Sequence, residues 1–203
     1  MGYVRLKPRK MPAKQDKAAR TKFVRQTQIL RSAPKVDLWF CDETGFAGDP
    51  VPRQIMCLKG SRPTVPYYGS HVRSNAIGAV RPSDGKLISL VVPFVDTGVF
   101  QDFIQELNAA VNKRRRNVVI LDNAAWHKTS KLNWGILEPM YLPTYSPDLN
   151  PIEELWLALK REFFSWFWTK NEAELDDQVE LALKYYIDHP HLVKSICAMT
   201  IFD

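Results

Sequence analysis

The chain has 203 residues, of which 45% are hydrophobic and 25% charged, so it is long enough to bury the core of one domain. Its longest apolar run, Leu87 to Val95, is too short to cross a bilayer, and its basic, polar opening is not a secretory signal. Its three cysteines are far apart and form no CxxC pair, which argues against a disulfide framework or zinc site and favours a cytoplasmic protein without membrane contact.

Positive charge is concentrated at the beginning of the chain. Residues 1–31 hold ten basic side chains against one acid, a net charge of +9, and the remainder holds 18 against 21, a net charge of −3. Such a segment is typical of nucleic-acid binding, and a solubilising tail is the alternative. We expect a basic, DNA-contacting arm over residues 1–34, in which Lys14 to Leu30 can form a helix, and one domain over residues 35–203.

Two arginines of the following domain are added to the expected DNA contacts, although single basic side chains are more often simply solvated. The full set of expected DNA-contacting residues is Arg5, Lys7, Arg9, Lys10, Lys14, Arg62 and Arg73.

The first strand of the domain is predicted at Val36 to Cys41, a short apolar run that ends at Asp42 and Glu43. A stretch rich in glycine and proline follows from Gly45 to Ser70 and contains a further short strand at Gln54 to Leu58.

A β-hairpin is predicted next. Ser74 to Val80 and Lys86 to Val92 read as strands, and the turn Pro82 to Gly85 between them contains an Asp-Gly pair. Together with the first strand, this hairpin forms an antiparallel meander.

A covering helix follows the hairpin. Asp96 or Thr97 caps it, and the basic run Lys113 to Arg116 ends it. That run complements the helix dipole, and contact with DNA is the alternative. The apolar face of the helix holds Val99, Phe100, Phe103, Ile104, Leu107, Ala110 and Val111.

A second apolar strand, Val118 to Leu121, also ends at an acid, in Asp122-Asn123. A short helix around Lys128 to Leu132 and a brief strand near Pro139 to Leu142 come after it. The order of three meandering strands, helix, strand, helix, strand and helix is that of a ribonuclease H-like α/β fold with a mixed five-stranded sheet flanked by helices.

Asn150, Pro151 and Glu153 mark the start of the next helix. Asn150 suits the N-cap, Pro151 the first helical position and Glu153 the third, as in a capping box. Glu153 or Glu154 then lies at the rim of the buried stripe. A capping role alone is the alternative for Glu153. The stripe consists of Ile152, Leu155, Trp156, Leu159 and Phe163.

The last part of the chain contains the aromatic run Phe163 to Trp168 and a final helix. The run suits core packing, and stacking on an unpaired base or binding to another protomer are the alternatives. The final helix opens with a second capping box, Asn171 to Glu174, and stops at Pro190.

Three acids are expected to meet at one edge of the sheet. Asp42 and Asp122 each end a strand, and Glu153 begins a helix that can approach them. Clustered carboxylates repel one another unless a cation neutralises them, and hard ions such as Mg²⁺ or Mn²⁺ bind through carboxylate oxygens. The pattern therefore indicates a divalent metal site.

Three motifs carry a resemblance to a known family. The stretches Phe40 to Thr44, Leu121 to His127 and Tyr145 to Glu153 resemble the catalytic domain of mariner-superfamily DDE transposases, most closely the bacterial insertion-sequence branch. The resemblance covers Val36 to Phe164, and the last motif is specific.

The resemblance implies roles for individual residues. Asp42 and Asp122 become the two metal-binding aspartates and Glu153 the third acid, with Glu154 as the fallback. Residues 123–152 separate the last two acids, an interval shorter than expected for the family, which indicates a trimmed connection.

Two neighbouring side chains take supporting roles. Asn123 and His127 belong to the same motif as Asp122, and we expect His127 to position the site or a phosphate, with Asn123 acting similarly and neither binding the metal.

The resemblance also implies the chemistry. Two divalent ions about 3.5 to 4 Å apart would activate a water or a DNA 3′-hydroxyl for in-line attack. We expect cleavage at the ends of a mobile element and joining to double-stranded target DNA, at TA sites, within a homodimer or larger synaptic assembly.

One feature departs from that family. Its members carry N-terminal helix-turn-helix domains, whereas only a short basic arm precedes this domain, so a separately encoded DNA-binding half is one expectation. The alternatives are a non-catalytic DNA-binding or regulatory partner of a full transposase, and a ribonuclease H-like nuclease.

Overall fold

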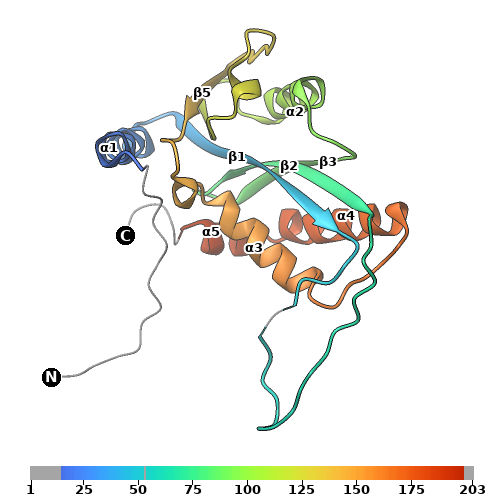
Figure 1. Ribbon diagram of the computed structural model, residues 1–203. Helices are drawn as coiled ribbons and strands as arrows, with labels where there is room; N and C mark the ends of the chain where they lie inside the picture. The colour runs from blue at the N-terminus through green and yellow to red at the C-terminus, as the bar shows by residue number, and fades with distance from the viewer. Residues whose placement is uncertain (1–14, 53, 199–203) are drawn as a thin grey trace, which may run out of the picture.

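The computed structural model describes residues 15–52 and 54–198 (Figure 1). In chain order the elements are α1 (Lys17–Ser32), β1 (Val36–Ala47), β2 (Arg73–Arg81), β3 (Lys86–Val92), α2 (Thr97–Ala110), β4 (Arg116–Leu121), the 3₁₀ helix η1 (Ala125–Lys128), β5 (Leu137–Tyr141), the 3₁₀ helix η2 (Pro147–Leu149), α3 (Ile152–Phe163), α4 (Glu172–Asp188) and α5 (Pro190–Ala198). Within these residues no helix is long and apolar enough to cross a membrane.

The five strands form one mixed sheet in the order β3-β2-β1-β4-β5. β1, β2 and β3 pair antiparallel, as the predicted meander requires, whereas β1 pairs with β4 and β4 with β5 in parallel. The parallel pairs are joined by crossovers that contain α2 and η1, which is how parallel strands must be connected. The predicted mixed five-stranded sheet is confirmed.

Helices cover both faces of the sheet (Figure 1). α2 packs on one face, where Trp39 and Cys41 of β1 join its buried side chains. α3, α4 and α5 pack on the other face, toward which Phe40 of β1 points. Because side chains alternate along a strand, residue parity in β1 decides which layer a side chain enters.

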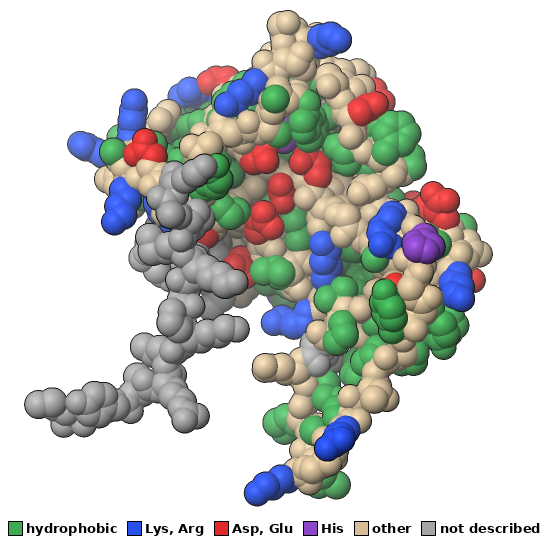
Figure 2. All heavy atoms as spheres, viewed as in Figure 1, with side chains coloured by type: hydrophobic (Ala, Val, Ile, Leu, Met, Phe, Trp, Pro, Cys, Tyr) green, Lys and Arg blue, Asp and Glu red, His purple; other side chains and the backbone are tan. Residues whose placement is uncertain are grey.

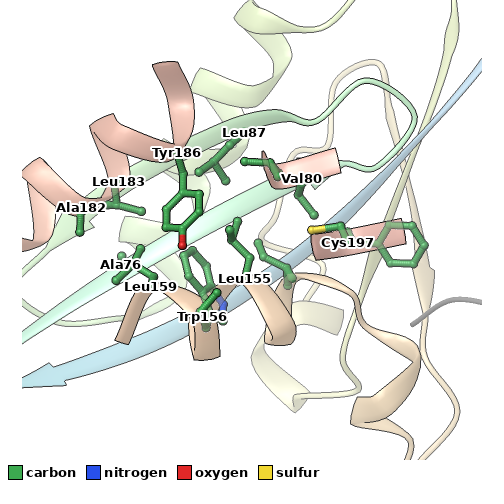
Figure 3. Packing of buried hydrophobic residues seen from close by; sticks show 14 of the residues in the cluster. Ala76, Val80, Leu87, Leu155, Trp156, Leu159, Ala182, Leu183, Tyr186 and Cys197 are labelled. Carbon is green, nitrogen blue, oxygen red and sulfur yellow. The ribbon is translucent and has the colours of Figure 1, made fainter. Parts of the chain in front are cut away.

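The larger core cluster lies beneath α3 and α4 (Figure 3). There Trp156 of α3 and Tyr186 of α4 meet the small side chain of Ala76 on β2, and all three are at most 2% exposed. Truncating a buried aromatic of this kind costs about 3–5 kcal/mol, so this layer fixes the position of α3 firmly.

α1 is docked on the domain. Its Phe23 and Thr27 are buried, and the Arg20 guanidinium donates to both oxygens of Asp148 at 2.9 and 2.6 Å. Gln15 donates to the Tyr145 carbonyl at 2.8 Å. The helix predicted at Lys14 to Leu30 is thus present at Lys17–Ser32 and contacts the loop ahead of α3.

Five of the seven expected DNA contacts belong to the part of the chain outside the described residues. They are Arg5, Lys7, Arg9, Lys10 and Lys14. The boundary between arm and domain after residue 34 stays a prediction.

The first strand does not end at Asp42. β1 continues to Ala47 because β2 stays paired with it along this whole extension, through Phe46↔Ser74 and Ala47↔Arg73. The strand predicted at Gln54 to Leu58 is also wrong, because Met56 and Leu58 are exposed and form no strand with any described neighbour.

Two other element boundaries differ from the prediction. The short helix comes earlier, at Ala125–Lys128, because the Asp122 carboxylate accepts the Ala124 N–H at 2.9 Å and turns the chain at once. Pro190 follows the end of α4 as predicted, but it also begins α5, since proline suits the first position of a helix.

Candidate active site

Asp42 and Asp122 occupy equivalent positions on neighbouring strands. The parallel pairing of β1 with β4 ends at Phe40↔Ile120, and each acid comes two residues later. Phe40 and Ile120 both belong to the core cluster under α3, so the strand alternation directs Asp42 and Asp122 to that same side. Beyond the last pair β4 ends while β1 continues with β2, which opens space between the two acids.

α3 brings Glu153 to this place. Ile152, Leu155 and Trp156 bury the helix against the sheet, which leaves Glu153 partly exposed at the rim and Glu154 fully on the outside. Glu153 lines the cavity described below, whereas Glu154 does not.

A glycine permits the close approach of α3. Gly78 of β2 lies directly opposite Asp42 of β1, and the Trp156 ring covers it. A Cβ at residue 78 would come within 2.7 Å of that ring. Any larger residue would push α3, and with it Glu153, away from Asp42.

The three predicted acids line one cavity of about 240 Å³. Its wall is completed by Asn123, Asn150 and the loop from Leu142 to Pro147. Figure 2 shows acidic side chains gathered in a hollow at the centre of the viewed face, with basic side chains below them. The cavity has room for ions together with their waters.

Electrostatic strain marks the cavity. Burial, followed by the charges of Glu153 and Glu43, raises the pKa of Asp42 to about 8. Burial also raises the pKa of Glu153, although the Lys160 ammonium opposes this shift. The raised pKa values indicate that nearby positive side chains do not offset the cost of ionising Asp42 and Glu153. A bound cation would lower that cost.

His127 connects the two strands that carry the aspartates. Its Nδ1 lies 2.7 Å from Asp122 Oδ1 and its Nε2 lies 3.1 Å from Glu43 Oε1. The ring is only 1% exposed and packs against Phe100 with centroids 4.7 Å apart. The Tyr141 hydroxyl donates to the His127 carbonyl, so both ring and backbone are fixed.

Asn123 is held by both ends of its amide. Its Nδ2 donates to the Leu142 carbonyl, and its Oδ1 accepts from the Lys128 ammonium. These bonds tie the segment after β4 to the loop after β5, which forms the opposite wall of the cavity.

Asn150 is not the predicted helix cap. Pro151 occupies the cap position of α3, and the Asn150 side chain makes no capping hydrogen bond. Its Nδ2 donates instead to the Cys41 carbonyl at 3.2 Å, which ties the start of α3 to β1 beside Asp42. The capping-box prediction was therefore wrong in its contacts, although the helix does begin at this point.

The donor atoms suit a hard divalent cation. The cavity presents carboxylate oxygens from three elements, and the buried Asn150 Oδ1 has no hydrogen-bond partner among the described residues. Across residues 15–52 and 54–198, however, no three His, Cys, Asp or Glu side chains are placed to hold one ion together. The cavity therefore offers the oxygen donors that a divalent cation requires, but the described side chains do not converge on one point where an ion could bind.

Lys160 is a charged neighbour of Glu153 and Asp42 that the sequence analysis missed, although it does not line the cavity. It lies seven residues after Glu153, hence on the same face of α3, and its Nζ is 5.3 Å from the centroid of the Phe46 ring. Burial lowers the pKa of Lys160, while Glu153 and Asp42 oppose that shift. The i, i+7 spacing was the signal that could have revealed it.

The two remaining arginines lie away from the cavity lining. Arg73 donates to the carbonyls of Ser70 and Val72, and Arg62 is exposed on the long loop between β1 and β2 that extends from the body in Figure 1. The structure does not bring either residue to the three acids.

The aromatic run Phe163 to Trp168 contributes both to the core and to the contact with the long loop between β1 and β2. Phe164 is 1% exposed and packs against Phe46, whereas Trp166 and Trp168 are about half exposed. Trp168 stacks on Tyr68 at 4.3 Å and thereby holds the base of the long loop.

Comparisons with known proteins agree on one family. Residues 37–175 match the family model for the DDE superfamily endonuclease. An uncharacterized protein, y4pE/y4sA, from Sinorhizobium fredii (strain NBRC 101917 / NGR234) is 34% identical over 120 residues, which cover 59% of this chain and 89% of that protein. The insertion element IS630 uncharacterized 39 kDa protein from Shigella sonnei is 27% identical over 107 residues, or 50% of this chain and 31% of that protein.

Solved structures agree with the fold. A Mos1 transposase paired-end complex with left transposon end superimposes with a TM-score of 0.67 at 15% identity, covering 99% of this chain and 66% of that chain. The catalytic domain of Mos1 mariner transposase gives a TM-score of 0.59 at 12% identity, covering 97% and 96%. This chain thus spans about a third of the Shigella protein and about two thirds of the longer Mos1 chain.

The family match covers more than half of the chain, and the sheet order and flanking helices match the ribonuclease H-like fold that was predicted. The chain therefore belongs to the DDE superfamily of endonucleases, with the fold of the mariner transposase catalytic domain.

Proposed function

We propose that this chain is the catalytic domain of a mariner-type transposase, which cleaves DNA at the ends of a mobile element and joins those ends to target DNA at TA sites. The observation that carries the proposal is the meeting of Asp42, Asp122 and Glu153 at one cavity from two strands and a helix. The Mos1 strand transfer and paired-end complexes support it, since their fold is the same.

The three acids hold two Mg²⁺ or Mn²⁺ ions in this proposal, and Mos1 complexes with Mn and with Mg support that choice. When bound, such ions lower the pKa of an attacking water or 3′-hydroxyl and stabilise the leaving oxygen. The nucleophile is a water or a DNA hydroxyl.

The side chains of this domain prepare the site for that chemistry. His127 fixes the rotamer of Asp122 through a 2.7 Å contact, and Glu43 fixes His127 from the other ring nitrogen. Lys160, on the same face of α3 as Glu153, supplies a positive charge for the phosphate backbone of the bound strand. Asn123 braces the loop that forms the far wall.

Double-stranded DNA and a second copy of the chain are the proposed partners. The loop between β1 and β2 exposes Met56, Leu58 and Tyr67, a large apolar area for a surface loop. Burial of these side chains against another protomer would assemble two catalytic domains on two element ends. Chromosomal DNA as the substrate places the protein in the bacterial cytoplasm.

A strand-transfer assay tests the proposal. Pre-cleaved element ends and a target plasmid are incubated with Mg²⁺ or Mn²⁺ and with either the wild type or Asp122→Asn. Joining at TA that disappears in the variant supports the proposal. Cleavage without joining would favour a ribonuclease H-like nuclease, and DNA binding without either reaction would favour a non-catalytic regulatory partner.

A further inference from the structure

Asn150 is buried in the wall of the acidic cavity. It is 3% exposed and lines the same cavity as the three acids. Its backbone carbonyl accepts the Glu153 N–H at 3.1 Å, and its side chain reaches the residue that precedes Asp42. Asn150 is therefore connected by hydrogen bonds to the backbone at Glu153 and next to Asp42.

The orientation of the Asn150 amide is fixed by its partner. A backbone carbonyl only accepts hydrogen bonds, so the group that faces Cys41 O at 3.2 Å is the Nδ2 amine. Oδ1 must then point the other way. It is inaccessible to bulk water and has no hydrogen-bond partner among the described residues.

The buried Asn150 Oδ1 needs either a hydrogen-bond donor or a cation as a partner. A buried amide oxygen without a partner is unfavourable, and native proteins leave few of them. Among the side chains that line the cavity, Asn123 Nδ2 binds the Leu142 carbonyl and the Ser146 hydroxyl binds the Thr144 carbonyl, and no described donor reaches Asn150 Oδ1. The acids of the same cavity cannot donate to it either once a bound cation keeps them ionised.

We infer that Asn150 Oδ1 is a ligand of the divalent cation that Asp42 and Glu153 bind. This inference rests on the proposed metal site and adds a residue to it. Amide oxygens are accepted ligands of hard cations. A neutral ligand adds a metal bond without adding to the repulsion among three carboxylates, which explains why residue 150 carries an amide instead of a fourth acid.

Manganese binding to the full chain tests the inference. Mn²⁺ affinity is measured by electron paramagnetic resonance for the wild type, Asn150→Ala and Asn150→Asp. Loss of the oxygen in Asn150→Ala should weaken binding by roughly 10-fold or more. Asn150→Asp keeps an oxygen and should bind at least as tightly as the wild type.

A matched control separates ligand loss from loss of a buried amide. Asn117 is 0% exposed, and its side chain bonds Trp39, Asn112 and Arg115 at the other end of β4. Asn117→Ala should lower stability and leave Mn²⁺ affinity unchanged.

A spectroscopic readout separates a ligand from a residue that only positions α3. Electron–nuclear double resonance on Mn²⁺-loaded protein with ¹³Cγ-labelled asparagine should show a coupled carbon that disappears in Asn150→Asp. Unchanged Mn²⁺ affinity in Asn150→Ala, or the absence of that coupling, would overturn the inference and leave the three-acid site intact. A wild type that binds no Mn²⁺ would overturn the metal site itself.

Discussion

Replacement of Asp42 by asparagine should stabilise the metal-free protein at pH 8. The pKa of Asp42 is raised from 3.8 to about 8 by burial and by neighbouring carboxylates, so the folded protein retains a proton that the unfolded chain releases. Each pH unit corresponds to about 1.4 kcal/mol, which sets an upper limit of about 6 kcal/mol. Because Asp42 stays partly exposed, water screens the charge, and we expect a gain of about 2–4 kcal/mol.

The pH dependence follows from the sign of this shift. Below about pH 4 the carboxyl is protonated in both states and the variant gains nothing from the loss of charge. Between about pH 4 and 8 the wild type loses stability as the pH rises, since ionisation is easier in the unfolded chain. The variant should lose correspondingly less over this range.

Urea unfolding in EDTA at pH 4, 6 and 8 measures the difference. Asp102→Asn, at an exposed position of α2, serves as the control and should show no comparable gain. Added Mg²⁺ should stabilise the wild type more than Asp42→Asn. A variant that is no more stable than the wild type at pH 8, or a difference independent of pH, would refute the electrostatic reasoning.

Three other substitutions test the surroundings of the acids. Lys160→Met should slow strand cleavage by roughly 10-fold or more, because the proposed charged hydrogen bond to a DNA phosphate is lost. Arg161→Met removes the same charge from an exposed neighbouring residue and should change the cleavage rate little. His127→Gln should lower the cleavage rate by roughly 10- to 100-fold with DNA affinity retained, and equal loss of both would count against a positioning role. Gly78→Ala should reduce the free energy of unfolding by about 1–3 kcal/mol and weaken Mn²⁺ binding, because the new methyl group displaces Trp156; unchanged metal affinity would show that α3 adapts.

The sequence was most informative where short-range patterns decide the structure. Alternation and apolar content predicted β3 at its observed bounds, and the apolar spacing with Asp96 or Thr97 as the cap predicted the start of α2. The predicted end of that helix was wrong, because α2 stops at Ala110, before the basic run Lys113 to Arg116. The stripe of α3 was likewise readable, and it singled out Glu153 or Glu154 as the rim residue.

Contacts between distant residues were not readable. β1 runs past Asp42 because β2 supports it, and β2 begins only at Arg73, after the long loop. Asn150 looked like a cap because its partner, the Cys41 carbonyl, lies 109 residues away in the chain. Local capping preferences are weak enough for such a tertiary hydrogen bond to override them.

The acids could be named from strand ends and motif resemblance, and residue parity explains why the two aspartates face the same layer. A residue two positions beyond a core side chain in a strand faces the same layer, so Asp42 follows Phe40 and Asp122 follows Ile120. The neighbouring Glu43 faces the other side and meets His127. That partnership depends on the ring packing of η1 against Phe100, which no local pattern encodes.

The most direct test of the metal site is anomalous diffraction from crystals soaked in Mn²⁺. The account predicts anomalous density in the cavity between Asp42, Asp122 and Glu153, with the carboxylates drawn together around it, and its loss in Asp122→Asn. Density confined to other surfaces, with the three acids unchanged in position, would contradict it.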